Sequence, residues 1–201
     1  MSLNEILAAE YIPWLLGVAA TLLAVVFVVR LRRAKDRLQK VFDEISFDRI
    51  EGLVIPNGDD GEIQIDHLLL TARGLLVVDI KDVAGTVFGS DKMQDWTVIA
   101  ADRRFTFSNP QPALYDRVAA VAHIVRQVPV AGRILFLDGA EFTKGVPDNV
   151  ANLDELRQQF VEADTAAAKF KIDAFRPHWE QLQKAALKPG SAAVEPLGTG
   201  S

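Results

Sequence analysis

IQIDHLLLTARGLLVVDIK, residues 63–81, contains two apolar runs separated by the short segment TARG at residues 71–74. Two apolar runs around a short turn that contains glycine predict a β-hairpin. Gly74 can adopt the positive φ that tight hairpin turns require. The sequence therefore predicts a hairpin whose turn is centred on Ala72 and Arg73.

The predicted hairpin places four polar side chains on one face. With the turn centred in this way, Asp66 lies opposite Asp79, and Gln64 lies opposite Lys81. Opposed residues share a face, and so do residues two apart on one strand, so these four side chains are neighbours. The other residues expected on this face are apolar: Leu68, Leu70, Leu75 and Val77.

Charged groups among apolar strands cost free energy unless something compensates them. One lysine does not neutralise two carboxylates. A hard divalent cation on Asp66 and Asp79, with Lys81 at a bound phosphate, would compensate all three groups. The alternative is a structural ion pair across the hairpin, which stabilises a sheet by roughly 0.2–1 kcal/mol.

Asp66 followed by Asp79-Ile80-Lys81 resembles the Asp…(Asp/Glu)-x-Lys signature, PD-(D/E)xK, of restriction-endonuclease-like nucleases. Over roughly residues 50–160 the chain is also similar to the nuclease-related domain (NERD) family. The similar positions are an Ile-Asp-His strand, a strand running from a glycine to the lysine, two later glycines, a tryptophan, and an Asn-Pro pair before a helix. In this chain they are Ile65-Asp66-His67, Gly74 to Lys81, Gly85, Gly89, Trp96 and Asn109-Pro110.

The resemblance implies metal-dependent hydrolysis of phosphodiester bonds in nucleic acid. Asp66, Asp79 and a backbone carbonyl would hold Mg²⁺ or Mn²⁺. Lys81 would orient the attacking water or hold the phosphate. Gln64 would contact water or substrate, or is simply a polar residue at the strand edge.

The chain departs from the family pattern in three places. Asp79 stands where the family usually has Glu, and a family glutamine shortly after Asn-Pro is missing near Ala113. The family's acidic residue on the preceding helix has Asp36, Asp43 and Glu44 as candidates. These departures leave a second function open, a catalytically inactive, membrane-tethered module that binds nucleic acid or acts as a scaffold.

An uncharged segment near the N-terminus predicts a membrane anchor. Residues 11–29 contain no charged side chain, and as a helix they are about 28 Å long, close to the roughly 30 Å of a bilayer core. Acidic residues precede the segment and basic residues follow it, whereas a signal peptide has basic residues first. By the positive-inside rule, we expect a single-pass cell-membrane protein whose C-terminal domain is cytoplasmic.

The composition limits the classes of partner. The chain has no cysteine, which excludes disulfides and thiolate metal sites. Its net charge of −5 argues against a broad basic surface for nucleic acid, so such contact is expected to be local or metal-assisted. The basic residues 30–40 can contact anionic lipid. Pairing of the helix at residues 31–45 into a homodimer is a further alternative.

Four segments are expected: an N-terminal segment with the transmembrane helix (1–30), a basic juxtamembrane stalk (31–47), the nuclease-related domain (48–187) and a disordered tail (188–201). Apolar periodicity predicts further strands and helices in the domain, with a loop at 83–94. The strands are 50–56, 96–100, 104–107 and 133–138; the helices are 113–128, 153–168 and 172–187, the last bent or restarted at Pro177. We therefore expect an α/β fold with a mixed central β-sheet flanked by helices and preceded by one transmembrane helix.

Overall fold

The structure is a computed structural model that describes residues 3–57, 61–101 and 103–186. The chain divides into two compact units, Met1–Lys40 and Val41–Ser201, and each is described by itself. The predicted tail (188–201) lies outside the described residues.

A single helix, α1 (Leu3–Ile45), runs through the first unit and ends in the second. The predicted membrane segment, residues 11–29, lies within α1, although more than half of its side chains fall outside the described part of the structure. Among the residues that are described, no helix has both the length and the apolar character needed to cross a membrane. The stalk predicted at residues 31–45 is helical, as expected.

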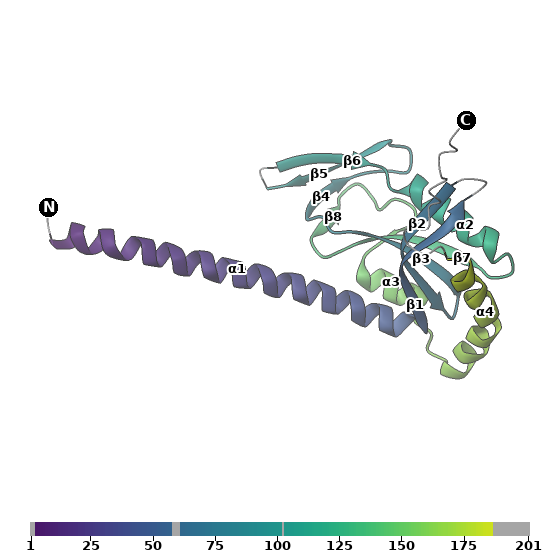
Figure 1. The fold of residues 1–201 in the computed structure, drawn as a ribbon. Coiled ribbons are helices and arrows are strands. Elements are labelled where there is room, and N and C mark those ends of the chain that lie inside the picture. Colours follow the sequence, from purple (N-terminus) through teal and green to yellow (C-terminus); the bar gives the residue numbers. More distant parts are fainter. Residues whose placement is uncertain (1–2, 58–60, 102, 187–201) are drawn as a thin grey trace, which may run out of the picture. The chain divides into compact units, whose positions relative to one another are not determined.

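The second unit contains a five-stranded mixed sheet with strand order β1-β2-β3-β7-β9 (Figure 1). The strands β1, β2 and β3 pair antiparallel, whereas β7 and β9 extend the sheet in parallel. A mixed sheet with helices packed on it confirms the predicted α/β class. The strands are β1 (Asp48–Asn57), β2 (Gly61–Thr71), β3 (Gly74–Lys81), β7 (Val130–Phe136) and β9 (Val150–Ala151).

The hairpin of β2 and β3 has the register predicted from the sequence. Pairing runs from Thr71 opposite Gly74 to His67 opposite Val78. The next pair in this register is Asp66 and Asp79, but it lies just beyond the paired residues. The apolar residues expected on one face all belong to one buried cluster: Leu68, Leu70, Leu75 and Val77.

A second sheet of four strands, in the order β6-β5-β4-β8, was not expected. The hairpin predicted near residues 96–107 is confirmed as β5 (Asp95–Ala100) and β6 (Arg103–Ser108). The loop predicted at residues 83–94 was wrong in part, because β4 (Gly85–Phe88) pairs with both β5 and β8 (Ala140–Phe142). The single sheet of the prediction is therefore replaced by two sheets that share one buried cluster.

Helices α2 (Gln111–Ile124) and α4 (Thr165–Ala185) cover the face of the first sheet that carries the hairpin's apolar residues. Leu114 of α2 and Trp179 of α4 both belong to the same buried cluster as Leu68. The helix α2 lies close to β7, because a Cβ atom on Gly132 would come within 2.7 Å of Val118.

Two helix predictions were wrong in extent. One helix was expected over residues 153–168, but α3 spans Leu153–Phe160 and α4 begins at Thr165. The reason is Asp164, whose carboxylate accepts hydrogen bonds from two backbone N–H groups of the next turn and so caps α4. Pro177 lies inside α4, which continues to Ala185, so the predicted restart does not occur.

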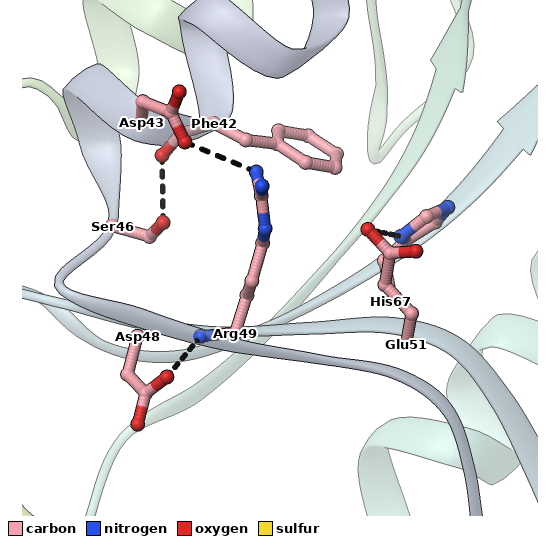
Figure 2. A network of polar contacts seen from close by, with 7 residues as sticks. All are labelled: Phe42, Asp43, Ser46, Asp48, Arg49, Glu51 and His67. Carbon is pink, nitrogen blue, oxygen red and sulfur yellow. Dashed lines mark hydrogen bonds and ion pairs between the residues drawn. The ribbon is translucent and has the colours of Figure 1, made fainter.

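Polar contacts fix the chain where α1 passes into β1 (Figure 2). The hydroxyl of Ser46 donates to the carbonyl of Phe42 at 2.6 Å and closes the helix end. Arg49 then reaches back to Asp43 at 3.1 Å. Asp48 accepts a hydrogen bond from the indole of Trp179 at 2.8 Å, which ties the start of β1 to α4.

The hairpin turn depends on Gly74, and Gly74→Ala should test this. Gly74 has φ of 116°, and a Cβ atom there would lie 2.2 Å from the carbonyl oxygen of Pro129. That oxygen also accepts the N–H of Leu75 at 2.9 Å, so it cannot move away freely. We expect Gly74→Ala to lower the free energy of unfolding by about 2–5 kcal/mol in urea denaturation of the full chain.

Gly145→Ala is the matched control. Gly145 has φ of 97° but no heavy atom within 4 Å of the added Cβ. In this control, the free energy of unfolding should fall only by the cost of placing alanine at positive φ, about 1–2 kcal/mol. Equal losses in the two variants would show that the close contact at Pro129 does not matter.

Candidate functional site

Asp66 and Asp79 lie at the end of the hairpin pairing, on neighbouring strands. Asp79 is buried, with 3% of its surface exposed, whereas Asp66 is exposed and Lys81 is half-buried. The charges of Asp66 and Lys81 both act on the pKa of Asp79, so the structure brings the three groups into one neighbourhood. The expectation that all three are embedded among apolar residues was wrong for Asp66, because the strands are no longer paired there.

Arg117 of α2 holds the site together. Its Nη1 donates to Oδ2 of Asp79 at 2.7 Å, and its Nε donates to the backbone carbonyl of Gln64 at 2.8 Å. One guanidinium group therefore joins β3 to β2 where the strand pairing has ended. Because Asp79 is buried, this charge-assisted bond replaces part of the hydration that the carboxylate has lost.

The sequence reasoning missed Arg117, although the sequence carries a signal for it. Residues three and four apart share one face of a helix. Arg117 lies three residues after Leu114 and four before Val121, and both of these are fully buried. A charged side chain within an apolar helical stripe indicates a buried partner of opposite charge.

The electrostatics of Asp79 are dominated by burial. Burial raises the pKa of Asp79 above its ordinary value of 3.8, and the neighbouring Arg117 lowers it in part. Asp66 raises this pKa, while Lys81 and His67 lower it. Among the described residues, Oδ1 of Asp79 is buried and has no hydrogen-bond partner. A buried carboxylate oxygen without a partner calls for an explanation, such as a bound ion or water.

His67 packs away from the carboxylates, in line with the expectation that it faces the other side of the hairpin. Its ring meets Phe42 edge to face at 5.5 Å between centroids. Its Nδ1 lies 3.9 Å from Oε1 of Glu51 (Figure 2), which is too long for a hydrogen bond. The side chain of Gln64 is exposed, and its role in substrate contact stays a prediction.

In the second unit, neither Asp43 nor Glu44 is grouped with Asp66 and Asp79 as a third acidic ligand. Asp43 bonds to Arg49 (Figure 2), and Glu44 pairs with Arg157; Asp36 lies in the first unit. In the described part of the chain, no three His, Cys, Asp or Glu side chains are grouped as a metal site. A metal ion at this site would therefore have two carboxylate ligands from the protein, Asp66 and Asp79.

Two carboxylates are sufficient for one kind of metal. Mg²⁺ is commonly held by one or two carboxylates, with waters and substrate phosphates as its other ligands. Arg117 occupies Oδ2 of Asp79, and Oδ1 remains without a protein partner in the described structure. Asp79 and the exposed Asp66 therefore fit a hard divalent cation.

Gln111 follows Asn109-Pro110 directly, two residues before the position near Ala113 where the family glutamine is missing. Gln111 is 2% exposed, and its Nε2 donates to Oδ1 of Asp91 at 2.6 Å and to the carbonyl of Asp148 at 2.8 Å. The hydrogen bond from Gln111 lowers the pKa of Asp91. These bonds connect the start of α2 to two loops, so the role of Gln111 is structural.

The pKa of Asp79 tests the balance between burial and Arg117. In a carboxyl ¹³C NMR titration of the full chain, we expect the pKa of Asp79 to lie above 3.8 and to rise further in Arg117→Gln. The folded protein then binds this proton more tightly than the unfolded chain. The contribution of Asp79 to the free energy of unfolding therefore falls as the pH rises from about 3.8 through the raised pKa.

Arg49→Gln is the matched control, since it removes an arginine that pairs with the exposed Asp43 instead. It should leave the titration of Asp79 unchanged. A wild-type pKa below 3.8 for Asp79 would mean that Arg117 outweighs burial, contrary to this account.

The sequence model of the nuclease-related domain (NERD) family matches residues 29–137, more than half of the 201 residues. An uncharacterized protein of Bacillus anthracis is 31% identical over 64 residues, which are 32% of this chain and 30% of that protein. The match thus spans less than a third of that relative. No solved structure matches the chain. On the strength of the family match, which includes Asp66, Asp79, Lys81 and Arg117, this chain belongs to the nuclease-related domain family.

Proposed function

We propose that this protein is a membrane-anchored nuclease that hydrolyses phosphodiester bonds of nucleic acid with Mg²⁺ or Mn²⁺ at Asp66, Asp79 and Lys81. One observation carries the proposal. Oδ1 of Asp79 is buried without a partner in the described structure, next to a second carboxylate and a lysine, in a member of the nuclease-related domain family. The mixed sheet is also compatible with a restriction-endonuclease-like fold.

Each residue has a separate role in the proposal. Asp66 and Asp79 would hold the metal ion, which when bound stabilises negative charge on the phosphate and lowers the pKa of a water nucleophile. Lys81 holds the phosphate or orients the water. Arg117 keeps the carboxylate of Asp79 in place with Oδ1 free. Because the pKa of Asp79 is raised, protons compete with the metal, and metal affinity should fall as the pH falls towards that pKa.

The membrane anchor at residues 11–29 and the cytoplasmic location of the domain belong to the same proposal. They rest on the uncharged run and on the basic residues that follow it. Contact of residues 30–40 with anionic lipid, and pairing of two chains through the stalk, are further parts that follow from the sequence alone.

A second candidate function is a binding or scaffold module without catalysis. The observation that favours it is the bond between Arg117 and Asp79, which already gives the buried carboxylate a cation. A buried carboxylate that pairs with an arginine does not require a metal ion to compensate its charge. In that case nucleic acid would bind through local contacts, and no phosphodiester bond would be cleaved.

A cleavage assay distinguishes the two functions. The full chain, purified in mild detergent, is incubated with supercoiled plasmid, linear duplex DNA, single-stranded DNA and RNA in the presence of Mg²⁺, Mn²⁺ or EDTA. We expect metal-dependent cleavage that Lys81→Ala slows by about 100-fold to 1,000-fold, because a positioned donor to the phosphate is lost.

Lys92→Ala is the control, because Lys92 is an exposed lysine in the same unit. This variant should cleave nucleic acid as fast as the wild type. If the folded wild type cleaves nothing in either metal, the binding module is the better account. Cleavage that Lys81→Ala leaves unchanged would assign the activity to another site or to a contaminant.

A further inference from the structure

A cavity lies between α2 and β7, lined by Leu114 and Val118 of the helix and by Gly132 and Arg133 of the strand. Its volume is about 280 Å³, close to the lower end of small-molecule sites, which measure roughly 300–1,000 Å³. While Arg117 of α2 reaches towards Asp79, Tyr115 of the same helix bonds to Asn149 just before β9. The lining includes three apolar residues, Leu114, Val118 and Val130. It also includes three polar residues, Tyr115, Arg133 and Asn149.

Arg133 is the charged group of this cavity, and its bonds all go to neutral acceptors. Its Nε donates to the side-chain oxygen of Gln159 at 2.8 Å. Its Nη1 donates to the carbonyl of Gly132 at 2.7 Å and to the side-chain oxygen of Asn149 at 3.2 Å. The guanidinium also lies over the ring of Phe160 at 5.6 Å. None of these bonds uses Nη2, so two N–H donors of the arginine remain.

Among the described residues, no acidic side chain pairs with Arg133. Within residues 3–57, 61–101 and 103–186, no carboxylate lies within ion-pair distance of Arg133, whereas Arg49, Arg117 and Arg157 each pair with one. Burial lowers the pKa of Arg133. A half-buried cation without a counter-charge is costly, and an anionic ligand would remove that cost.

Asn149 is held in an uncommon conformation at the same place. Its φ is 59°, in the left-handed region that costs free energy for residues other than glycine. Its side chain accepts the bond from Arg133 and donates to the hydroxyl oxygen of Tyr115 at 3.3 Å. Because that oxygen accepts a bond, the hydroxyl hydrogen of Tyr115 is available to a ligand.

We infer that the cavity between α2 and β7 binds a phosphate group, either as inorganic phosphate or as a nucleoside monophosphate. Nη2 of Arg133 and the hydroxyl of Tyr115 donate to the phosphate oxygens. The several oxygens of a phosphate can accept donors that come from two different elements of the fold. The half-buried Val118 and Val130 offer an apolar surface to the organic part of a nucleotide. This site does not depend on the proposed nuclease activity, and its residues are distinct from Asp66, Asp79 and Lys81.

Isothermal titration calorimetry of the full chain in EDTA tests the inference. The probes are inorganic phosphate, a nucleoside 5′-monophosphate and the same nucleoside without phosphate. We expect saturable binding of at least one phosphate-containing probe and none of the nucleoside. If inorganic phosphate binds more tightly than the nucleoside monophosphate, the ligand is free phosphate; if the nucleoside monophosphate binds more tightly, the ligand is a phosphate ester. Arg133→Gln should weaken binding by about tenfold to a hundredfold, because a charge-assisted hydrogen bond is lost.

Two further variants keep the test decisive. Tyr115→Phe removes the hydroxyl from a side chain that is 48% exposed, so folding should be retained while binding weakens severalfold. Arg104→Gln changes an exposed arginine of β6 and should bind like the wild type. The inference is overturned if neither phosphate-containing probe binds, if the nucleoside binds equally well, or if Tyr115→Phe binds as tightly as the wild type.

Discussion

The bond between Arg117 and Asp79 is the interaction on which the candidate site depends. It joins α2 to β3 and, through the carbonyl of Gln64, to β2. The two strands are no longer paired with each other at this point. Without the guanidinium, a buried carboxylate would lie unpaired in the core, which is among the most costly arrangements in a folded protein. The position of Asp79 therefore reflects the packing of α2 as much as the hairpin itself.

Side chains of α2 take part in both the proposed metal site and the inferred phosphate site. Arg117 satisfies one oxygen of Asp79, and the other oxygen is buried without a partner in the described structure, where the charges of Asp66 and Lys81 act on the same carboxyl group. Tyr115 of α2 and Arg133 of β7 both line the cavity between these two elements, and the hydroxyl oxygen of Tyr115 accepts a bond from Asn149. The helix thus contributes Arg117 to the proposed metal site and Tyr115 to the inferred phosphate site.

The sequence predicted what depends on local periodicity. The register of the hairpin follows from alternation around one turn, so Asp66 and Asp79 could be placed as neighbours before the fold was known. The partner Arg117 lies 38 residues beyond Asp79, and no local pattern fixes which strand a helix will cover. The strands β4 and β8 are short and form only through long-range pairing, so periodicity did not reveal them. The break between α3 and α4 was not predicted, because it depends on capping by Asp164 and not on apolar periodicity.

The central claim is that Asp66 and Asp79 form a divalent-metal site with Arg117 still bound to Asp79. A crystal structure of the full chain grown with Mn²⁺, with anomalous diffraction data, tests it most directly. The account predicts an anomalous peak within about 2.0–2.6 Å of a carboxylate oxygen from each aspartate, and no peak in Asp66→Asn crystals. The account would be contradicted if wild-type crystals at saturating Mn²⁺ showed no anomalous peak at these aspartates and Oδ1 of Asp79 were bonded to a protein group or a water molecule.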